Sequence, residues 1–134
     1  MIGMTAKIAD ETAKVIRAAD EASYRNLGHA AASIRRRAKE SIEISPTPSR
    51  PGHPPHSRRG QLPASLWYHV QHEQQATTAL VGPRASIVGE SASAHEFGKT
   101  YRGMKFSRRP FMAPALYASL SRFHESWRGS IRGD

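Results

Sequence analysis

The feature that most constrains the fold is a long stretch without proline, from about Thr5 to Glu43. It is rich in alanine, arginine, lysine and glutamate, which favour helices. Its apolar residues recur at steps of three and four, so the stretch predicts one long amphipathic helix, eased or kinked at Gly28. The apolar stripe is mostly alanine, which buries little area and allows close approach by a sheet of the same chain or by a neighbouring subunit. Arg35-Arg36-Arg37 is interpreted as a solvated face.

The helix is expected to end at Ser45-Pro46, since proline cannot continue it and restricts the residue before it. Residues 45–60 hold five prolines, two histidines and three arginines. This composition predicts an extended, polyproline-like arm.

Two strands are expected after the arm. They cover about Ser65 to Glu73 and Thr77 to Val81, and they are close enough in the chain to pair as an antiparallel hairpin. Residues 85–89 fit either a further strand or a short helix. Residues 90–97 favour a short helix, closed by Gly98.

The C-terminal third begins with a basic segment, Lys99 to Arg109, which indicates an exposed loop or loose hairpin. Pro110 keeps the following residues extended, and Pro114 suits the first turn of a helix over residues 113–128. Four large apolar residues of that helix share one face, which we expect to point inward: Leu116, Leu120, Phe123 and Trp127.

The predicted fold class is α+β, as a single domain over residues 1–134. The long helix (1–44) and the C-terminal helix (113–128) pack on a small, mainly antiparallel sheet within residues 61–112, and the Pro-rich arm (45–60) and the basic loop project. The predicted core consists of Phe97, Phe111, Leu116, Leu120, Phe123 and Trp127.

The net charge of +9 is uneven, with +5 in residues 76–134. Such a field favours an acidic partner, either nucleic acid or an acidic protein surface. The sequence has no cysteine, no apolar run of the roughly 20 residues that span a bilayer, and no pattern of a secretion signal. We therefore expect a protein made in the cytoplasm, without a membrane partner.

Enzymatic chemistry has little support in the sequence. His69 and His72 would point to opposite faces of a strand, so we predict no metal site. His95 and Glu96 are adjacent titratable residues, but neighbours on a helix point in different directions. Glu96 is expected to cap a turn or meet an arginine. We predict no catalysis, no cofactor and no small-molecule substrate.

Two motifs carry a resemblance to a known family. The first runs from Glu96-Phe97-Gly98 through the basic spacer to Arg109-Pro110-Phe111-Met112, with Pro114 opening a terminal helix. The second is the Pro-rich, basic segment from Ser49 to Leu62. Both resemble, in order and over about two-thirds of the chain, the neck and tail-completion (head-tail joining) proteins of long-tailed bacteriophages.

The resemblance implies a structural virion protein, assembled in the host cytoplasm as a homo-oligomeric ring with other neck and tail proteins. It favours an arm that orders on a ring neighbour over a mobile loop. The basic loop, whose cations are interleaved with Tyr101 and Phe106, is either solvated, docked on an acidic neighbour or facing DNA in the channel. A tail terminator or other minor tail protein, and a sequence-nonspecific DNA-binding protein, are the alternatives. Residues expected to meet partners are Arg50, Arg58, Arg59, Arg102, Lys105, Arg108 and Arg109.

Overall fold

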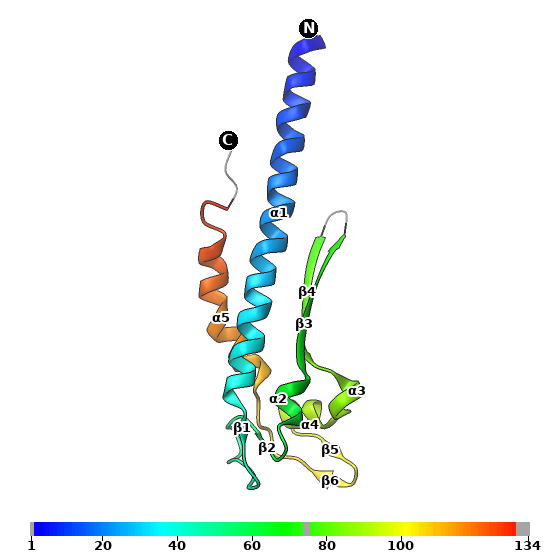
Figure 1. The fold of residues 1–134 in the computed structure, drawn as a ribbon, viewed down its shortest axis with the longest axis vertical. Coiled ribbons are helices and arrows are strands. Elements are labelled where there is room, and N and C mark those ends of the chain that lie inside the picture. The colour runs from blue at the N-terminus through cyan, green and yellow to red at the C-terminus, as the bar shows by residue number, and fades with distance from the viewer. Residues whose placement is uncertain (1, 74–75, 131–134) are drawn as a thin grey trace.

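The computed structural model describes the backbone of residues 2–73 and 76–130, and the side chains of residues 12–73 and 76–130. The protein is α+β and elongated, built along one long helix (Figure 1). This helix, α1, spans Ile2–Ser41 and runs through Gly28 without interruption. The predicted long helix is confirmed, and the predicted break at Gly28 is absent.

The other elements follow α1 as three pairs of strands and four further helices. The strands form three separate two-stranded sheets, of which β1 with β2 is parallel and the other two are antiparallel, instead of the one small sheet that was predicted. Residues 85–88 are helical, so the short helix, and not the further strand, is the correct one of the two alternatives for residues 85–89. In chain order the elements are β1 (Glu43–Ile44), β2 (His56–Ser57), α2 (Gln61–Ser65), β3 (Leu66–Glu73), β4 (Ala76–Pro83), α3 (Ala85–Val88), α4 (Ser91–Phe97), β5 (Thr100–Tyr101), β6 (Met104–Lys105) and α5 (Met112–Ser126).

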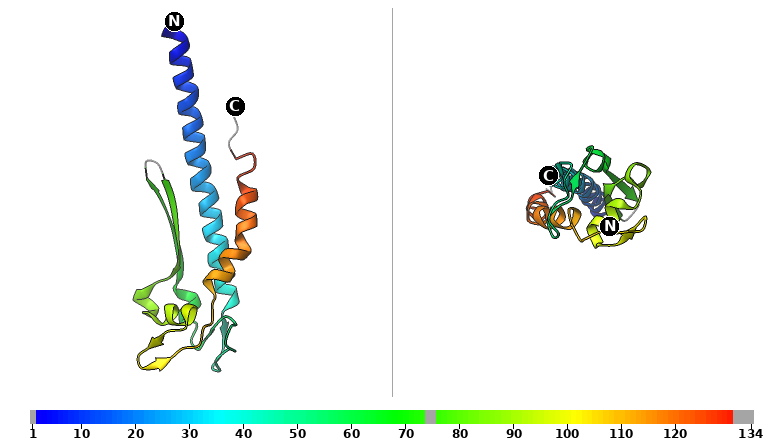
Figure 2. Two further views of the ribbon diagram at one scale, coloured as in Figure 1. Left: turned by 180° about the vertical axis from the view of Figure 1, so that it is seen from behind. Right: turned by 90° about the horizontal axis from the view of Figure 1, so that it is seen from below.

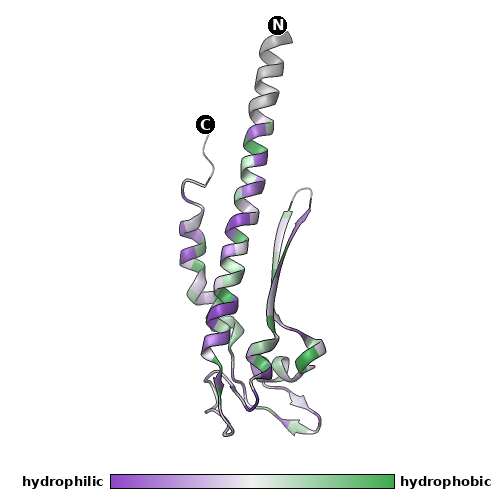
Figure 3. Ribbon diagram, viewed as in Figure 1, coloured by the Kyte–Doolittle hydropathy of each residue, from purple (hydrophilic) through white to green (hydrophobic). Residues whose placement is uncertain are grey.

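The β3–β4 hairpin and α5 lie on opposite sides of α1 (Figures 1 and 2). On the hairpin, Val70 pairs with Ala79 and both are half-buried, whereas Leu80 on the other face is 57% exposed. The blue N-terminal part of α1 extends beyond the other described elements. Figure 3 shows that hydrophilic and apolar residues alternate along the described length of α1.

The main core lies where the C-terminal end of α1 meets α2, α4 and the start of α5, and we call this end of the molecule the base. Its buried members are Ala38, Ile42, Leu62, Leu66, Ala92, Phe111 and Ala115. Phe111 is 1% exposed, which confirms its predicted place in the core. Phe97 is 65% exposed, so the prediction that it belongs to the core is wrong. The reason is that α4 turns Ala92, Ala94 and Glu96 inward, which leaves Phe97 on its outer side.

Helix α5 faces α1 with small residues. Ala115 and Ser119 are buried, while Leu116 and Leu120 are 42% and 36% exposed, so the predicted inward face is wrong for both leucines. Phe123 and Trp127 are half-buried and pack edge to face, with ring centroids 6.3 Å apart. The α1 residues that these side chains meet are also small: the Ser33 Oγ lies 3.5 Å from the Ser119 Oγ, and Ala38 shares the core with Ala115. Small side chains on both helices favour close packing of the two helices.

The Pro-rich segment does not project as an extended arm, and that prediction is wrong. Its two ends pair as β1 and β2, and Pro55 is fully buried. The Gly52 N–H donates to the Arg108 carbonyl (2.8 Å), and a ring nitrogen of His56 lies 2.7 Å from the Thr47 carbonyl oxygen. These contacts stabilise a closed loop because they satisfy backbone groups that an extended arm would leave to water or to a partner.

Candidate partner-binding surface

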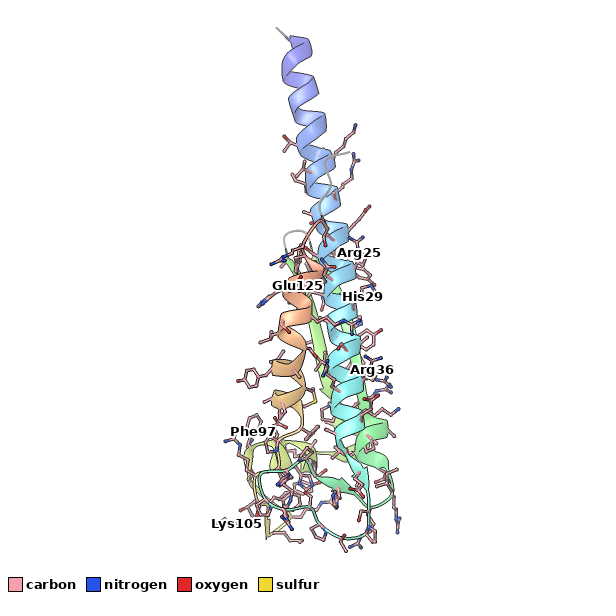
Figure 4. The ribbon with its side chains drawn as sticks, turned by 90° about the vertical axis from the view of Figure 1, so that its left-hand side faces the viewer. Arg25, His29, Arg36, Phe97, Lys105 and Glu125 are labelled. Atoms are coloured by element: carbon pink, nitrogen blue, oxygen red, sulfur yellow. The ribbon has the colours of Figure 1, made fainter. Side chains whose placement is uncertain are left out.

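Two basic segments that lie about fifty residues apart in the sequence come together at the base. The first is the closed loop with the residues after it, 45–60, and the second is the β5–β6 hairpin with its flanks, 99–109. Figure 4 shows Lys105 and Phe97 at this end of the molecule, far from the N-terminus of α1. All the residues expected to meet partners belong to these two segments.

Arg109 differs from the other six predicted partner residues, because it is half-buried and they are exposed. Its Nε and Nη2 atoms both donate to the Ser49 carbonyl, each at 3.0 Å. Its backbone N–H donates to the His95 carbonyl at 2.6 Å. Arg109 therefore joins the two basic segments to each other, and the structure assigns it a role inside the protein.

The two segments border a groove of about 770 Å³, which we call the basic groove. Residues 56–59 with Gln61 and Leu62 form one wall, residues 85–89 with Ser91 form another, and His95, Tyr101 and Arg102 complete it. Arg58, Arg59 and Arg102 line it, and none of the residues lining it is acidic. A smaller hollow of about 170 Å³ adjoins it, with His56, Arg58 and His95 common to both. Outside the lining, the Glu43 carboxylate lies 3.5 Å from the Nε2 atom of His56.

The turn between β5 and β6 holds Arg102 in an unusual backbone conformation. Arg102 has φ of 51° and Gly103 has φ of 76°, the pair of left-handed values that a tight hairpin turn requires. Glycine, asparagine and aspartate take such values readily, whereas arginine does so at a cost. The Arg102 guanidinium lies 5.3 Å from the centre of the Tyr101 ring.

Glu96 caps α5 from a distance in the sequence. Its carboxylate is buried and accepts the N–H groups of Phe111 and Met112 on Oε2 (2.8 and 3.0 Å) and of Ala113 on Oε1 (3.0 Å). These are the N–H groups at the start of a helix that have no partner within the helix, and a negative charge there is also favourable. Glu96 was expected to cap a turn or to meet an arginine; it does act as a cap, but of the terminal helix α5 instead of a turn.

His95 and Glu96 do not act together. The His95 ring packs on Phe106, with ring centroids 4.8 Å apart, and its Nδ1 atom is buried without a hydrogen-bond partner among the described residues. Burial, and secondarily the positive charge of Arg109, lower the pKa of His95 below its ordinary value of 6.5. The lowered pKa favours the neutral imidazole, whose ring packs at a tilt on Phe106 instead of pairing with an acid.

The sequence interpretation missed the wall of the basic groove formed by residues 85–89 with Ser91, because none of these residues is charged. It also treated Arg35 as solvated, although the Arg35 Nε donates to the Leu66 carbonyl (2.9 Å) and so ties α1 to β3. Arg36 and Arg37 are exposed, as expected of a solvated face.

His69 and His72 do lie on opposite faces of the hairpin: His69 stacks on Trp67, and His72 lies 4.0 Å from Asp20 of α1. Among the described residues, no group of three histidine, aspartate or glutamate side chains could hold a metal ion. None of the described helices combines the length and the apolar character needed to cross a bilayer. No protein-family model, curated protein or solved structure matches the chain.

Proposed function

We propose that this chain is a structural virion protein of a long-tailed phage, a ring component of the neck that completes the tail and joins it to the head. The observation that carries the proposal is the exposure of large apolar side chains, each at least about a third exposed in the described part of the chain. These side chains are found on α1 (Val15, Ile16), on the outer face of the hairpin (Trp67, Leu80) and on α5 (Leu116, Tyr117, Leu120).

The projecting part of α1 suits contact with a second copy of the chain. Val15 and Ile16 are 52% and 55% exposed there, although they are β-branched apolar residues on a helix. The charged residues near them are mixed in sign: Lys14, Arg17, Asp20 and Glu21. This near-neutral surface can meet its own copy without strong repulsion, whereas the basic ends of two copies repel each other.

The β3–β4 hairpin offers a second route to assembly. It is a two-stranded sheet, and both of its outer edges are unpaired among the described residues. Exposed strand edges readily accept a strand from another chain. A ring neighbour that pairs with this edge would therefore stabilise both subunits.

Electron microscopy of phage particles from a strain that lacks this protein tests the proposal. We expect filled heads and separate tails that fail to join, with joining restored when the intact gene is supplied from a plasmid. Particles of normal appearance would overturn the neck assignment. Light scattering on the purified chain adds an independent measurement. If these exposed surfaces mediate self-association, the average molar mass should increase with protein concentration.

A tail terminator or other minor tail protein remains the closest alternative within the same class. It would present the same apolar surfaces and differ in its neighbour. Mutant particles distinguish the two, since loss of a terminator gives tails of irregular length, whereas loss of a joining protein gives tails of normal length beside filled heads.

A further inference from the structure

The basic groove concentrates unpaired positive charge. In the described part of the chain, Arg58, Arg59 and Arg102 take part in none of the ion pairs, and all three are exposed. The groove they line holds no acidic side chain. Three guanidinium groups without counter-ions around one concave surface create a positive potential that a negatively charged ligand would relieve.

The hydroxyl groups of the groove add neutral donors. Ser57, Ser86 and Tyr101 line it, and the Tyr101 Oη would lie 3.0 Å from a Cβ atom placed on Gly89. The tyrosine ring therefore lies directly against the Gly89 backbone, where a larger residue would displace it. Hydroxyl and guanidinium groups together are the usual protein donors to phosphate oxygens.

The conformation of Arg102 points to a use for its side chain. A left-handed backbone is costly for arginine and easy for asparagine or glycine, so the turn alone gives no reason for arginine at this position. Strained residues of this kind concentrate at binding sites. Arg102 lines the groove together with Arg58 and Arg59, and its guanidinium lies over the ring of Tyr101, another residue of the lining.

The character of the groove favours nucleic acid over an acidic protein. Ten of its fifteen lining residues are polar, and Ile87 is its only large apolar residue with high exposure. Protein interfaces have an apolar centre, whereas interfaces with nucleic acid are more polar and more positively charged. Exposed, spaced arginines suit a chain of phosphates better than one enclosed phosphate.

We propose that the basic groove binds the phosphodiester backbone of nucleic acid without regard to base sequence, with Arg58, Arg59 and Arg102 contacting phosphates. This site is independent of the assembly role, so either proposal can fail alone. In a neck component it would place the base of each subunit against DNA.

Fluorescence anisotropy with the full chain and a short labelled DNA duplex tests the site. The groove variant is R58Q/R59Q/R102N, and the control is R36Q/R37Q/R122Q, which removes the same charge from exposed residues of α1 and α5 that line no part of the groove. The affinity falls as salt rises, and each phosphate contact contributes about 0.9 to the steepness of log affinity against log salt concentration. Loss of three contacts in the groove variant should therefore make this dependence shallower by about 2.7. The control should keep the wild-type slope.

Four results would overturn the proposal, and the first three are no binding of the wild type at low salt, equal losses in both variants, and equal competition by a glutamate homopolymer and by unlabelled duplex at matched charge. The third outcome would assign the groove to an acidic protein. The fourth is displacement of the duplex by inorganic phosphate at the same phosphate concentration, which would replace the backbone site by a single-phosphate site.

The single variant R102N separates binding from folding. Asparagine fits the left-handed turn, so the thermal midpoint should stay unchanged or rise while the salt slope falls by about 0.9. A lowered midpoint would show that Arg102 supports the fold, and would remove it from the site.

Discussion

The base of the molecule and the projecting segment of α1, residues 12–17, are stabilised in different ways. At the base, four helices surround a shared core, and buried groups such as Phe111 and the Glu96 carboxylate hold them together. All six residues of the projecting segment are exposed, and no other described element lies beside that end of α1. An isolated helix is marginally stable in water, so the base has its own core to stabilise it, whereas under the proposed assembly the projecting segment would be stabilised by a neighbouring subunit.

The comparison separates the residues that stabilise the fold from the exposed apolar residues that we propose for assembly. The chain's few large buried residues define the protomer, and its large exposed apolar residues are available for assembly. The predictions below test that division, from the largest expected effect to the smallest.

The two phenylalanines near the base give the sharpest test. Phe111→Ala removes a side chain that is 1% exposed, and should lower the free energy of unfolding by about 4 kcal/mol. Phe97→Ala is the matched control, because Phe97 is 65% exposed, and should change the free energy by less than about 0.5 kcal/mol. Urea unfolding followed by circular dichroism measures both. Similar losses in the two variants would mean that the base is not packed as described.

The Glu96 cap gives the next effect. Glu96→Gln keeps the shape of the side chain but removes the charge and one of the acceptor oxygens that serve three backbone N–H groups. We expect a loss of about 2 kcal/mol, the usual contribution of hydrogen bonds to a charged group. Glu90→Gln, at an exposed position before α4, is the control and should be neutral in the same urea experiment.

The pH dependence of unfolding should report on His95. Its pKa in the folded protein lies below 6.5 through burial and the Arg109 charge, so below pH 6.5 the unfolded chain binds the proton more readily. The neutral imidazole therefore makes its full contribution to the free energy of unfolding above pH 6.5. This contribution decreases as the pH falls from 6.5 toward the lower pKa of the folded state. His95→Leu should flatten this part of the stability curve relative to wild type, and an unchanged curve would contradict the burial of the ring.

The projecting segment should respond in the opposite way to the base. Val15→Ser with Ile16→Ser removes its apolar surface, yet should change the free energy of unfolding of the base by less than about 0.5 kcal/mol. Self-association measured by light scattering should weaken in this variant. Loss of stability without loss of association would reverse the roles assigned to the two regions.

Much of the fold follows from local signals in the sequence. The proline-free stretch determined α1, the β-branched residues determined the hairpin, and Gly98, with φ of 71°, determined the end of α4. These features depend on residues close together in the chain, whose spacing and conformational preferences act before any tertiary contact forms.

Tertiary packing decided which faces are buried and which distant segments meet. Leu116 and Leu120 were predicted to be core residues because large apolar side chains favour burial, but α5 turns Ala115 and Ser119 toward α1, where Ala115 packs with Ala38 and Ser119 meets Ser33. Closure of the Pro-rich loop depends on Arg109 reaching the Ser49 carbonyl, sixty residues away. The basic groove likewise exists only after three separate segments have packed together, and no local pattern records such contacts.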